Sequence, residues 1–417
     1  MNEVMIDHTL VDLAHEVEKE IQPYFKRAEE ICKKNCQKVL DAFIKNRVCY
    51  QDFEEINGYG FYDGGRDKLE KVFADVFGTE DAIVRPQLMS ATNALWISLS
   101  GLLHYGDTMV AISGLPYDSL QGIIGLIGES KHALTRNGVS YEQIDLVDNK
   151  FDLEKIEKRM KKGGVKLVEI QRSRGYSHRE GLSIEQIEEV CKLVKSIDPN
   201  IIILVDNCYG EMVEEKEPTE VGADIVAGSL MHNIGGGIAT SGAYIAGKAD
   251  LIEEIADRFT APNIAKDLGA NYNQLNKMFK GLYLSPQSVL NAIKTAIFTG
   301  AITEKLGFEN VSPKCFKPRT DTVQCFDLGS AERLVAFCQG VQMGSPVDSY
   351  VLPIPCEFPG YPHEEVMASG TFTQGSTIEI TCDAPVIEPY TIYMQGGIAY
   401  EYSKIAVLSG LTKVLHM

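Results

Sequence analysis

Asp206 is the residue of this chain whose type and position point most directly to chemistry. It follows Ile201–Val205, a run in which every side chain is apolar, as in a strand covered by helices on both faces. A carboxylate at the end of such a strand is costly unless a partner holds it. A protonated ring nitrogen would be a suitable partner. A metal ion is the weaker alternative, because no histidine or second carboxylate is suitably placed nearby in the sequence.

Two further segments have the residues to hold a phosphate group. Ser90, Ala91 and Thr92 stand at the start of an expected helix, where free backbone N–H groups and the positive end of the helix dipole attract anions. Ser90 could equally be an ordinary N-cap. Ser229 follows another apolar run and could donate to a phosphate, and the glycines at 235–237 would let the backbone approach a ligand closely.

An aromatic ring and a pair of arginines follow two more apolar runs. Tyr117 could stack on a flat ring, although a tyrosine in a loop is more often simply packed. Arg172 and Arg174 suit an anion, and a solvated charged loop explains them equally well. In an open parallel sheet, ligands bind beyond the carboxyl ends of the strands. The five segments together therefore predict one shared binding site.

The elements that would position these residues alternate between strand and helix. A helix is expected from Ser183, with Gln186 completing a capping box, and an amphipathic helix is expected to end at Gly78. Repeated β-α-β order implies a mostly parallel sheet with right-handed crossovers. The expected strands are 82–84, 109–113, 166–170, 201–205, 224–227 and 243–247.

The pattern of helix and strand signals along the sequence predicts that the chain has three structural parts. Residues 1–55 are mainly helical and charged on one side, and we interpret them as an N-terminal arm. Residues 56–285 carry the alternating pattern and form the expected large domain. Residues 286–417 mix strand and helix signals and predict a smaller α+β domain.

Composition excludes several classes of protein. The 417 residues carry a net charge of −18, which would repel nucleic-acid phosphates and anionic lipid, so we expect neither kind of partner. The apolar runs are too short to span a bilayer, and the first ten residues lack a signal-peptide pattern. None of the ten cysteines forms a CxxC pair, which favours a reduced, cytoplasmic location.

Taken together, these segments resemble the fold-type-I enzymes of cysteine and methionine metabolism, which use pyridoxal 5'-phosphate (PLP). More closely, the chain is similar to the methionine γ-lyase-like family, also called aluminium resistance proteins. The resemblance implies an α/β, PLP-dependent transferase-like fold: a mostly parallel sheet with helices on both faces, plus the smaller C-terminal α+β domain. The segments that carry it are GYGFYDGGRDKLE at 58–70, RPQLMSATNAL at 85–95, GLPYDSL at 114–120, QRSRGY at 171–176, VDNCYGE at 205–211, GSLMHNIGGG at 228–237, RTD at 319–321, GTFTQGSTIE at 370–379 and YMQGGIAY at 393–400.

The resemblance also implies roles for the strand-end residues. Asp206 would pair with the protonated pyridine nitrogen of PLP, and Tyr117 would stack on its ring. The phosphate would bind the segment Ser90-Ala91-Thr92 and Ser229.

A second set of roles involves neighbouring subunits and the substrate. Tyr59 and Arg66 would reach the phosphate from a neighbouring subunit, which implies a homo-oligomer, at least a dimer and by resemblance a dimer of dimers. The substrate is a small-molecule amino acid. Arg319 is the candidate for its carboxylate, through a planar bidentate pair, and Arg174 is the second candidate.

The chain departs from the family pattern at His232. The pattern there reads roughly S-L-I-K-N-P-G-G-G, whereas this chain reads Ser229-Leu-Met-His-Asn-Ile-Gly235, so a histidine stands where the cofactor-binding lysine is expected. Imidazole forms no stable covalent link of that kind with the cofactor aldehyde. Lys248 is the nearest downstream lysine, but it follows the next expected strand and should lie far from the cofactor.

The resemblance implies a carbon–sulfur lyase acting on methionine, cystathionine or cysteine, with Tyr117, Asp206 and His232 in the catalytic site. His232 would move the Cα proton, for which an ordinary imidazole pKa of about 6.5 is suitable. Three alternatives stay open: a lysine-free enzyme that uses PLP or its amine form PMP with His232 as the base, a ligand-binding or assembly protein that has lost lyase activity, and a histidine that was engineered to trap a complex. A phosphosugar or nucleotide enzyme is disfavoured because no GxxxxGK[ST] or GxGxxG fingerprint is present.

Overall fold

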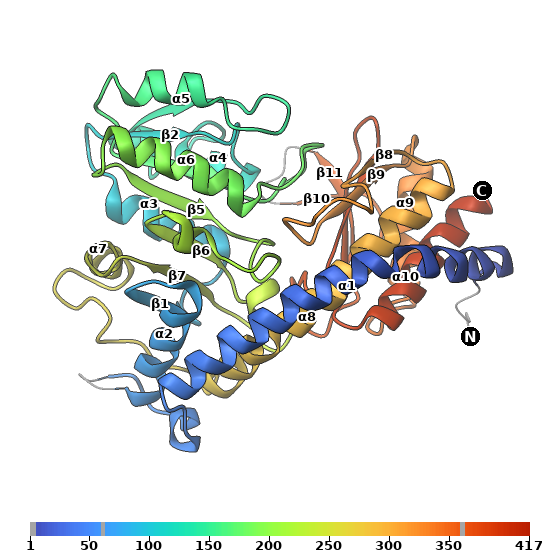
Figure 1. Ribbon diagram of the computed structural model, residues 1–417, viewed down its shortest axis with the longest axis horizontal. Helices are drawn as coiled ribbons and strands as arrows, with labels where there is room; N and C mark the ends of the chain where they lie inside the picture. The colour runs from blue at the N-terminus through green and yellow to red at the C-terminus, as the bar shows by residue number, and fades with distance from the viewer. Residues whose placement is uncertain (1–5, 60–62, 359–362) are drawn as a thin grey trace.

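Two β-sheets, joined by long helices, make up the fold in the computed structural model (Figure 1). The structure describes residues 6–59, 63–358 and 363–417, so residues 60–62 of the motif at 58–70 lie outside the described part. The first sheet has seven strands and the second has six.

The seven-stranded sheet has the order β1-β7-β6-β5-β4-β2-β3. Only β7 is antiparallel to its neighbours, so the other strands all point the same way and the expected mostly parallel sheet is confirmed. β3 is a short, largely exposed edge strand of polar sequence, which explains why no apolar run indicated it. The strands are β1 (Asp81–Arg85), β2 (Thr108–Ala111), β3 (Ser140–Gln143), β4 (Leu167–Gln171), β5 (Ile202–Asp206), β6 (Ile225–Ser229) and β7 (Ala243–Gly247).

Helices cover both faces of this sheet, and two apolar cores lie between helices and strands. One core includes Val168 and Ile170 of β4 and the inward faces of α2, α5 and α6, and the other includes Leu167 and the inward faces of α3, α4 and α7. The helices are α2 (Gly64–Phe77), α3 (Ala91–Leu102), α4 (Asp118–Ile124), α5 (Leu153–Met160), α6 (Ile184–Ile197) and α7 (Ala249–Phe259). The Ser183 capping box is confirmed, and Gly78 ends α2 with a φ of +63°.

The six-stranded sheet is antiparallel throughout, in the order β10-β11-β12-β13-β9-β8. The helices α9 (Ala331–Met343) and α10 (Tyr400–Leu415) belong to the same part of the chain and pack against each other, and α10 also packs against α8. The strands are β8 (Glu309–Ser312), β9 (Gln324–Asp327), β10 (Cys356–Glu357), β11 (Glu364–Ala368), β12 (Thr381–Pro385) and β13 (Thr391–Gln395).

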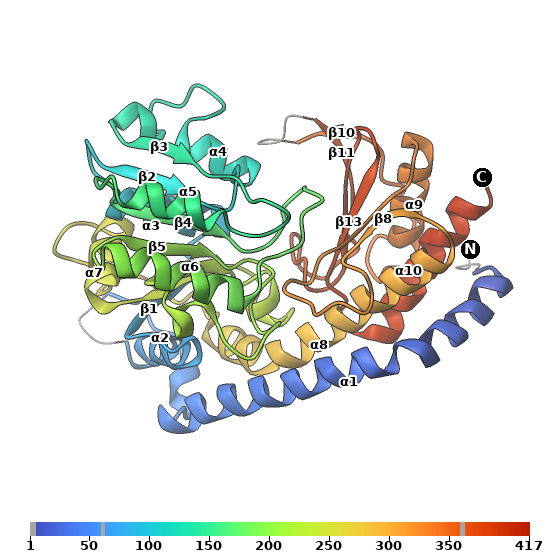
Figure 2. The ribbon, with the colours of Figure 1, turned by 45° about the horizontal axis from the view of Figure 1, so that its top comes forward.

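Two long helices run side by side along both sheets, as Figures 1 and 2 show. They are α1 (His8–Lys45) and α8 (Leu275–Lys305), and each contains an internal proline, Pro23 in α1 and Pro286 in α8. The domain boundary expected at residue 285 falls inside α8, and the three-part division stays a prediction. Within the described residues, no helix is long and apolar enough to cross a membrane.

Candidate active site

A pocket lies where the carboxyl ends of β4 and β5 meet the start of α3 and the second sheet. We call it the central pocket. It brings together five of the residues that the sequence singled out: Ala91, Thr92, Tyr117, Asp206 and His232. The rest of its lining is Leu95, Ser119, Leu120, Gln171, Ser173, Gly175, Tyr176, Cys208, Tyr209, Val323, Asp383 and Gln395.

Asp206 is the last residue of β5 and is 9% exposed at the wall of the central pocket. Its Oδ1 accepts a hydrogen bond of 3.1 Å from the amide of Cys208. Burial raises the pKa of Asp206, while the guanidinium of Arg179 acts in the opposite direction. In the part of the chain that the structure describes, no cation forms an ion pair with this carboxylate. A cationic ligand group would therefore meet a buried acid that has no ion-pair partner among the described residues.

The start of α3 supplies hydrogen-bond donors to the same pocket. Ser90 is the N-cap, and its Oγ accepts from the amide of Asn93 at 3.1 Å. The amides of Ala91 and Thr92 make no hydrogen bond to any described residue, as is usual for the first turn of a helix. The hydroxyls of Thr92 and Ser119 are 3.0 Å apart. Two backbone donors and the positive end of a twelve-residue helix thus face the pocket.

Ser229 does not line the central pocket. It ends β6, is buried, and its Oγ accepts from the amide of Met231 at 3.0 Å. This bond orders the turn that leads to His232. The phosphate contact expected for Ser229 stays a prediction.

Tyr117 lies at the mouth of the central pocket, just before α4. Its amide donates to Oε1 of Gln171 at 2.6 Å, and its ring meets that of Tyr176 edge to face, with centroids 5.6 Å apart. Gly175 has a φ of +58°, and a Cβ there would lie 3.1 Å from the Tyr117 ring. A glycine is therefore required both by the backbone conformation and by the close approach of this ring.

His232 precedes a short 3-10 turn, Asn233–Gly235, and is partly buried. Its Nδ1 is 2.6 Å from Oγ1 of Thr377, and its ring lies against Tyr209, with centroids 4.6 Å apart and planes inclined by 31°. Burial lowers the pKa of His232 to about 4. The structure thus corrects the expectation of an ordinary imidazole pKa near 6.5: the ring is neutral at pH 7, because the pocket disfavours its charged form.

Several polar residues of the site come from the second sheet, and no residue type or spacing in the sequence connected them with it. Nε2 of Gln395 donates to Oδ2 of Asp383 at 3.0 Å, while Oε1 of Gln395 is buried without a partner among the described residues. Burial raises the pKa of Asp383 to about 6 and that of nearby Glu365 to about 7. These residues lie on separate strands, so only the folded chain brings them to the pocket.

Two predicted phosphate ligands, Tyr59 and Arg66, lie outside the central pocket of this chain. Tyr59 is 82% exposed. The Arg66 guanidinium is buried; it pairs with Asp67 at 3.1 Å and lies 3.5 Å and 3.4 Å from the carbonyl oxygens of Gly58 and Gly269. Their expected contact with a neighbouring subunit stays a prediction.

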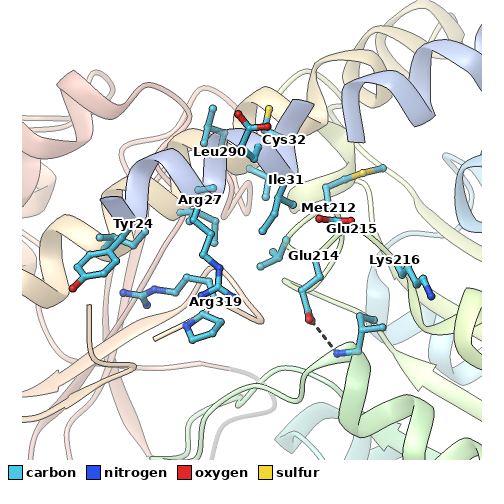
Figure 3. A pocket seen from close by; sticks show the side chains of 18 of the residues that line it. Tyr24, Arg27, Ile31, Cys32, Met212, Glu214, Glu215, Lys216, Leu290 and Arg319 are labelled. Atoms are coloured by element: carbon cyan, nitrogen blue, oxygen red, sulfur yellow. Dashed lines mark hydrogen bonds between the residues drawn. The ribbon is translucent and has the colours of Figure 1, made fainter. Parts of the chain in front are cut away.

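Neither of the two candidate arginines for the substrate belongs to the described lining of the central pocket, and both lie near Asp321. Arg319 does not face the central pocket. It lines a second pocket beside α1, together with Arg27, Ile31 and Leu290 (Figure 3), and one of its nitrogens donates to the Ala296 carbonyl at 3.1 Å. The role expected for Arg319 on the substrate carboxylate stays a prediction.

Arg174 lines a side pocket that shares Tyr117, Gln171 and Tyr176 with the central pocket. Its guanidinium donates to Sγ of Cys325 at 3.1 Å and lies 3.8 Å from Asp321. Arg174 therefore remains the better placed of the two substrate candidates.

Lysines are absent from the described lining of the central pocket. Lys248 follows β7, and because β7 runs antiparallel, its last residue, Gly247, pairs with Ile225 at the start of β6. Nζ of Lys248 is 2.6 Å from Oδ1 of Asp224. Lys248 therefore lies at the opposite edge of the sheet from Asp206, as expected.

The strand order, the single reversed strand and the pocket at the carboxyl edge define the fold of the fold-type-I, PLP-dependent proteins. The PLP-dependent protein YhfS of Escherichia coli shares this fold, with a TM-score of 0.62 over 92% of this chain and 96% of that chain, at 16% sequence identity.

The chain belongs to the methionine gamma-lyase family, whose profile matches residues 10–415. A carbon-sulfur lyase involved in aluminum resistance from Clostridium novyi NT is 42% identical, with a TM-score of 0.94 over 98% of this chain and 96% of that chain. The uncharacterized protein YnbB of Bacillus subtilis is 42% identical over 404 residues, 96% of both chains. The predicted family is confirmed, and the protein is carbon–sulfur lyase-like.

Proposed function

We propose that this protein is a PLP-dependent carbon–sulfur lyase for a sulfur amino acid, in which His232 carries the proton-transfer role usually given to a lysine. The observation that carries the proposal is the buried Asp206 carboxylate, which faces the central pocket without a cationic partner among the described residues. The free amides at the start of α3 supply the complementary anion site. A ligand with a protonated ring nitrogen and a phosphate would satisfy both.

The residues around the pocket fit PLP. When bound, this cofactor withdraws electrons from the substrate carbon. Asp206 would hold its pyridine nitrogen in the protonated state, the amides of Ala91 and Thr92 would bind its phosphate, and Tyr117 would cover its ring. Ser90 acts by capping the helix, and Ser229 acts by ordering the turn before His232.

His232 would be the base of the reaction. Because its imidazole is neutral at pH 7, a nitrogen lone pair is available to accept the Cα proton of the substrate. A base with a pKa of about 4 is weak, so it holds the proton only briefly and returns it readily. No covalent attachment of the cofactor to the protein is required in this scheme, and cofactor affinity then depends on Asp206 and the phosphate contacts.

The acidic wall of the site favours a substrate with a second ammonium group, of the cystathionine type. Asp383 and Gln395 line the central pocket, and Glu365 lines the adjoining side pocket. These acceptors suit the distal ammonium of such a substrate, whereas methionine has no group to match them. Arg174 is the candidate for a substrate carboxylate.

We propose a homo-oligomer, a dimer of dimers, in which Tyr59 and Arg66 of the partner subunit complete the phosphate site. We also propose that the protein is cytoplasmic and has neither nucleic-acid nor membrane partners, as the sequence predicts. Light scattering tests the oligomer, and a monomer at micromolar concentration would contradict this part of the proposal.

The experiment that tests the proposal measures PLP affinity and product formation separately. PLP binding is followed by quenching of protein fluorescence, and elimination is followed by release of a 2-oxo acid from cystathionine, cysteine or methionine. Asp206→Asn should weaken PLP binding roughly 100-fold, the cost of leaving one partner of a buried ion pair unmatched. Asp12→Asn, on the exposed face of α1, is the matched control and should bind like the parent.

The outcomes separate the candidate functions. PLP binding that depends on Asp206, together with 2-oxo acid release that His232→Gln abolishes, supports the lyase. PLP binding that depends on Asp206, without turnover of any substrate, supports the second candidate function, a ligand-binding protein. The absence of lysine from the described pocket lining is the observation that favours this second candidate. Binding that Asp206→Asn leaves intact would overturn both.

A further inference from the structure

The contact that fixes the imidazole of His232 comes from the other half of the molecule. Thr377 lies between β11 and β12 of the second sheet, 145 residues further along the chain. Its Oγ1 is 2.6 Å from Nδ1 of His232, short enough for a well-formed hydrogen bond. Thr377 belonged to a family motif in the sequence, but no residue type or spacing connected it with His232.

Backbone hydrogen bonds hold the Thr377 segment in place. The amides of Gly397 and Ile398 donate to the carbonyl oxygens of Ile378 and Glu379, each at 3.0 Å. The turn that carries Thr377 is therefore tied to the chain just after β13. A hydroxyl on such a fixed turn can set the direction of a neighbouring ring.

The surroundings of His232 decide which ring nitrogen faces the central pocket. Nδ1 is directed at Thr377 and the ring face lies on Tyr209, so Nε2 is the nitrogen left for a ligand. The Thr377 hydroxyl can donate to Nδ1 or accept from it. The arrangement in which it accepts is the one that leaves a lone pair on Nε2.

We infer that Thr377 is a positioning residue, whose hydroxyl oxygen accepts the Nδ1–H of His232 and so presents the lone pair of Nε2 to the pocket. Its use in catalysis rests on the proposed function. There, the Cα–H bond of the substrate breaks, its electron pair stays with the substrate, and the proton forms a new bond to Nε2. The resulting imidazolium is stabilised at Nδ1–H by the Thr377 oxygen.

The first test needs neither cofactor nor substrate. Nitrogen NMR of histidine-labelled protein reports which ring nitrogen carries the proton, with His232→Gln identifying the signal. The parent should show the proton on Nδ1. Thr377→Val keeps the shape but removes the hydroxyl, and should shift the ring toward the form with the proton on Nε2. Thr377→Ser should restore the parent spectrum, and Thr373→Val, in the same segment, should leave it unchanged.

The second test is exchange of the substrate Cα proton with solvent in the presence of PLP. Thr377→Val should slow this exchange at least about tenfold, with Thr377→Ser recovering most of it, because general base catalysis depends on orientation. An unchanged tautomer in Thr377→Val would overturn the inference whatever the activity. A tautomer change with no exchange in any variant, the parent included, would uphold the positioning role and count against the proposed lyase function.

Discussion

Glu169 is a buried acid whose ionisation should control the stability of this protein between about pH 5 and pH 8. It lies on β4, is fully buried, and neither of its carboxyl oxygens has a hydrogen-bond partner among the described residues. Burial raises the pKa of Glu169 from 4.5 to about 8, and the nearby carboxylate of Asp206 acts in the same direction. The folded chain therefore keeps this proton at pH values where the unfolded chain has lost it.

The sign and the size of the effect follow from that difference. Above pH 4.5 the unfolded chain binds fewer protons than the folded chain, so the free energy of unfolding falls as the pH rises, until Glu169 ionises near pH 8. At about 1.4 kcal/mol per pH unit, the loss reaches up to about 5 kcal/mol. Glu169→Gln removes the titration. The free energy of unfolding of the variant, relative to that of the parent, should therefore rise by this amount between pH 4.5 and pH 8.

Urea unfolding followed by the fluorescence of Trp96 is a suitable assay, because Trp96 is the single tryptophan and lies in α3, next to the central pocket. Any loss of stability caused by the buried glutamine amide is independent of pH, so it shifts the free energy of unfolding of the variant by the same amount at every pH. Glu188→Gln is the matched control: Glu188 lies on the surface of α6, paired with Lys192 at 2.6 Å, and this variant should follow the parent above pH 5. A parent-minus-variant difference that stays constant from pH 5 to pH 8 would refute the reasoning.

Three further predictions concern the site and its supports. His232→Lys should bind PLP covalently, so that borohydride leaves a pyridoxyl group on that lysine. The parent should yield no pyridoxyl group at Lys248 or elsewhere. A pyridoxyl-Lys248 peptide in mass spectrometry would contradict the assigned geometry. The Cα proton exchange of the parent should show no inflection near pH 6.5, because burial lowers the pKa of His232 to about 4; a step at pH 6.5 that His232→Gln abolishes would show an ordinary imidazole. Ser183→Ala should lower the free energy of unfolding by about 1 kcal/mol in urea titrations, because it removes the bond that the Gln186 amide donates to the Ser183 hydroxyl, and an unchanged midpoint would contradict that role.

The elements around the site were largely predictable because their signals are local. The buried strand that ends at Asp206 is apolar at each position before it, and the capping box at Ser183 and the glycine at 78 mark helix ends by their own chemistry. β3 carried no such signal, because an exposed edge strand needs no apolar run. Sequence order along a parallel sheet was then enough to place Tyr117 and Asp206 in one pocket.

What the sequence did not show depends on contacts between distant segments. Asp383 and Gln395 reach the pocket from strands of the second sheet, Thr377 contacts His232 from a turn, and no spacing in the chain relates them to Asp206. Arg319 was placed by resemblance, but the direction of its side chain depends on packing against α8. The lowered pKa of His232 likewise arises from surroundings that only the folded chain provides.

The paired helices α1 and α8 have a mechanical consequence for the two walls of the pocket. A proline leaves one missing hydrogen bond in each helix and makes that turn easier to bend. Pro286 lies beside Cys32, whose Sγ is 3.3 Å from its carbonyl oxygen, and Cys32 is about 13 Å along α1 from Pro23, at roughly 1.5 Å per residue. The turn at each proline thus packs against turns of the other helix that contain no proline. We expect the two sheets to resist a hinge motion, even though each of the two connecting helices contains one turn that bends more easily.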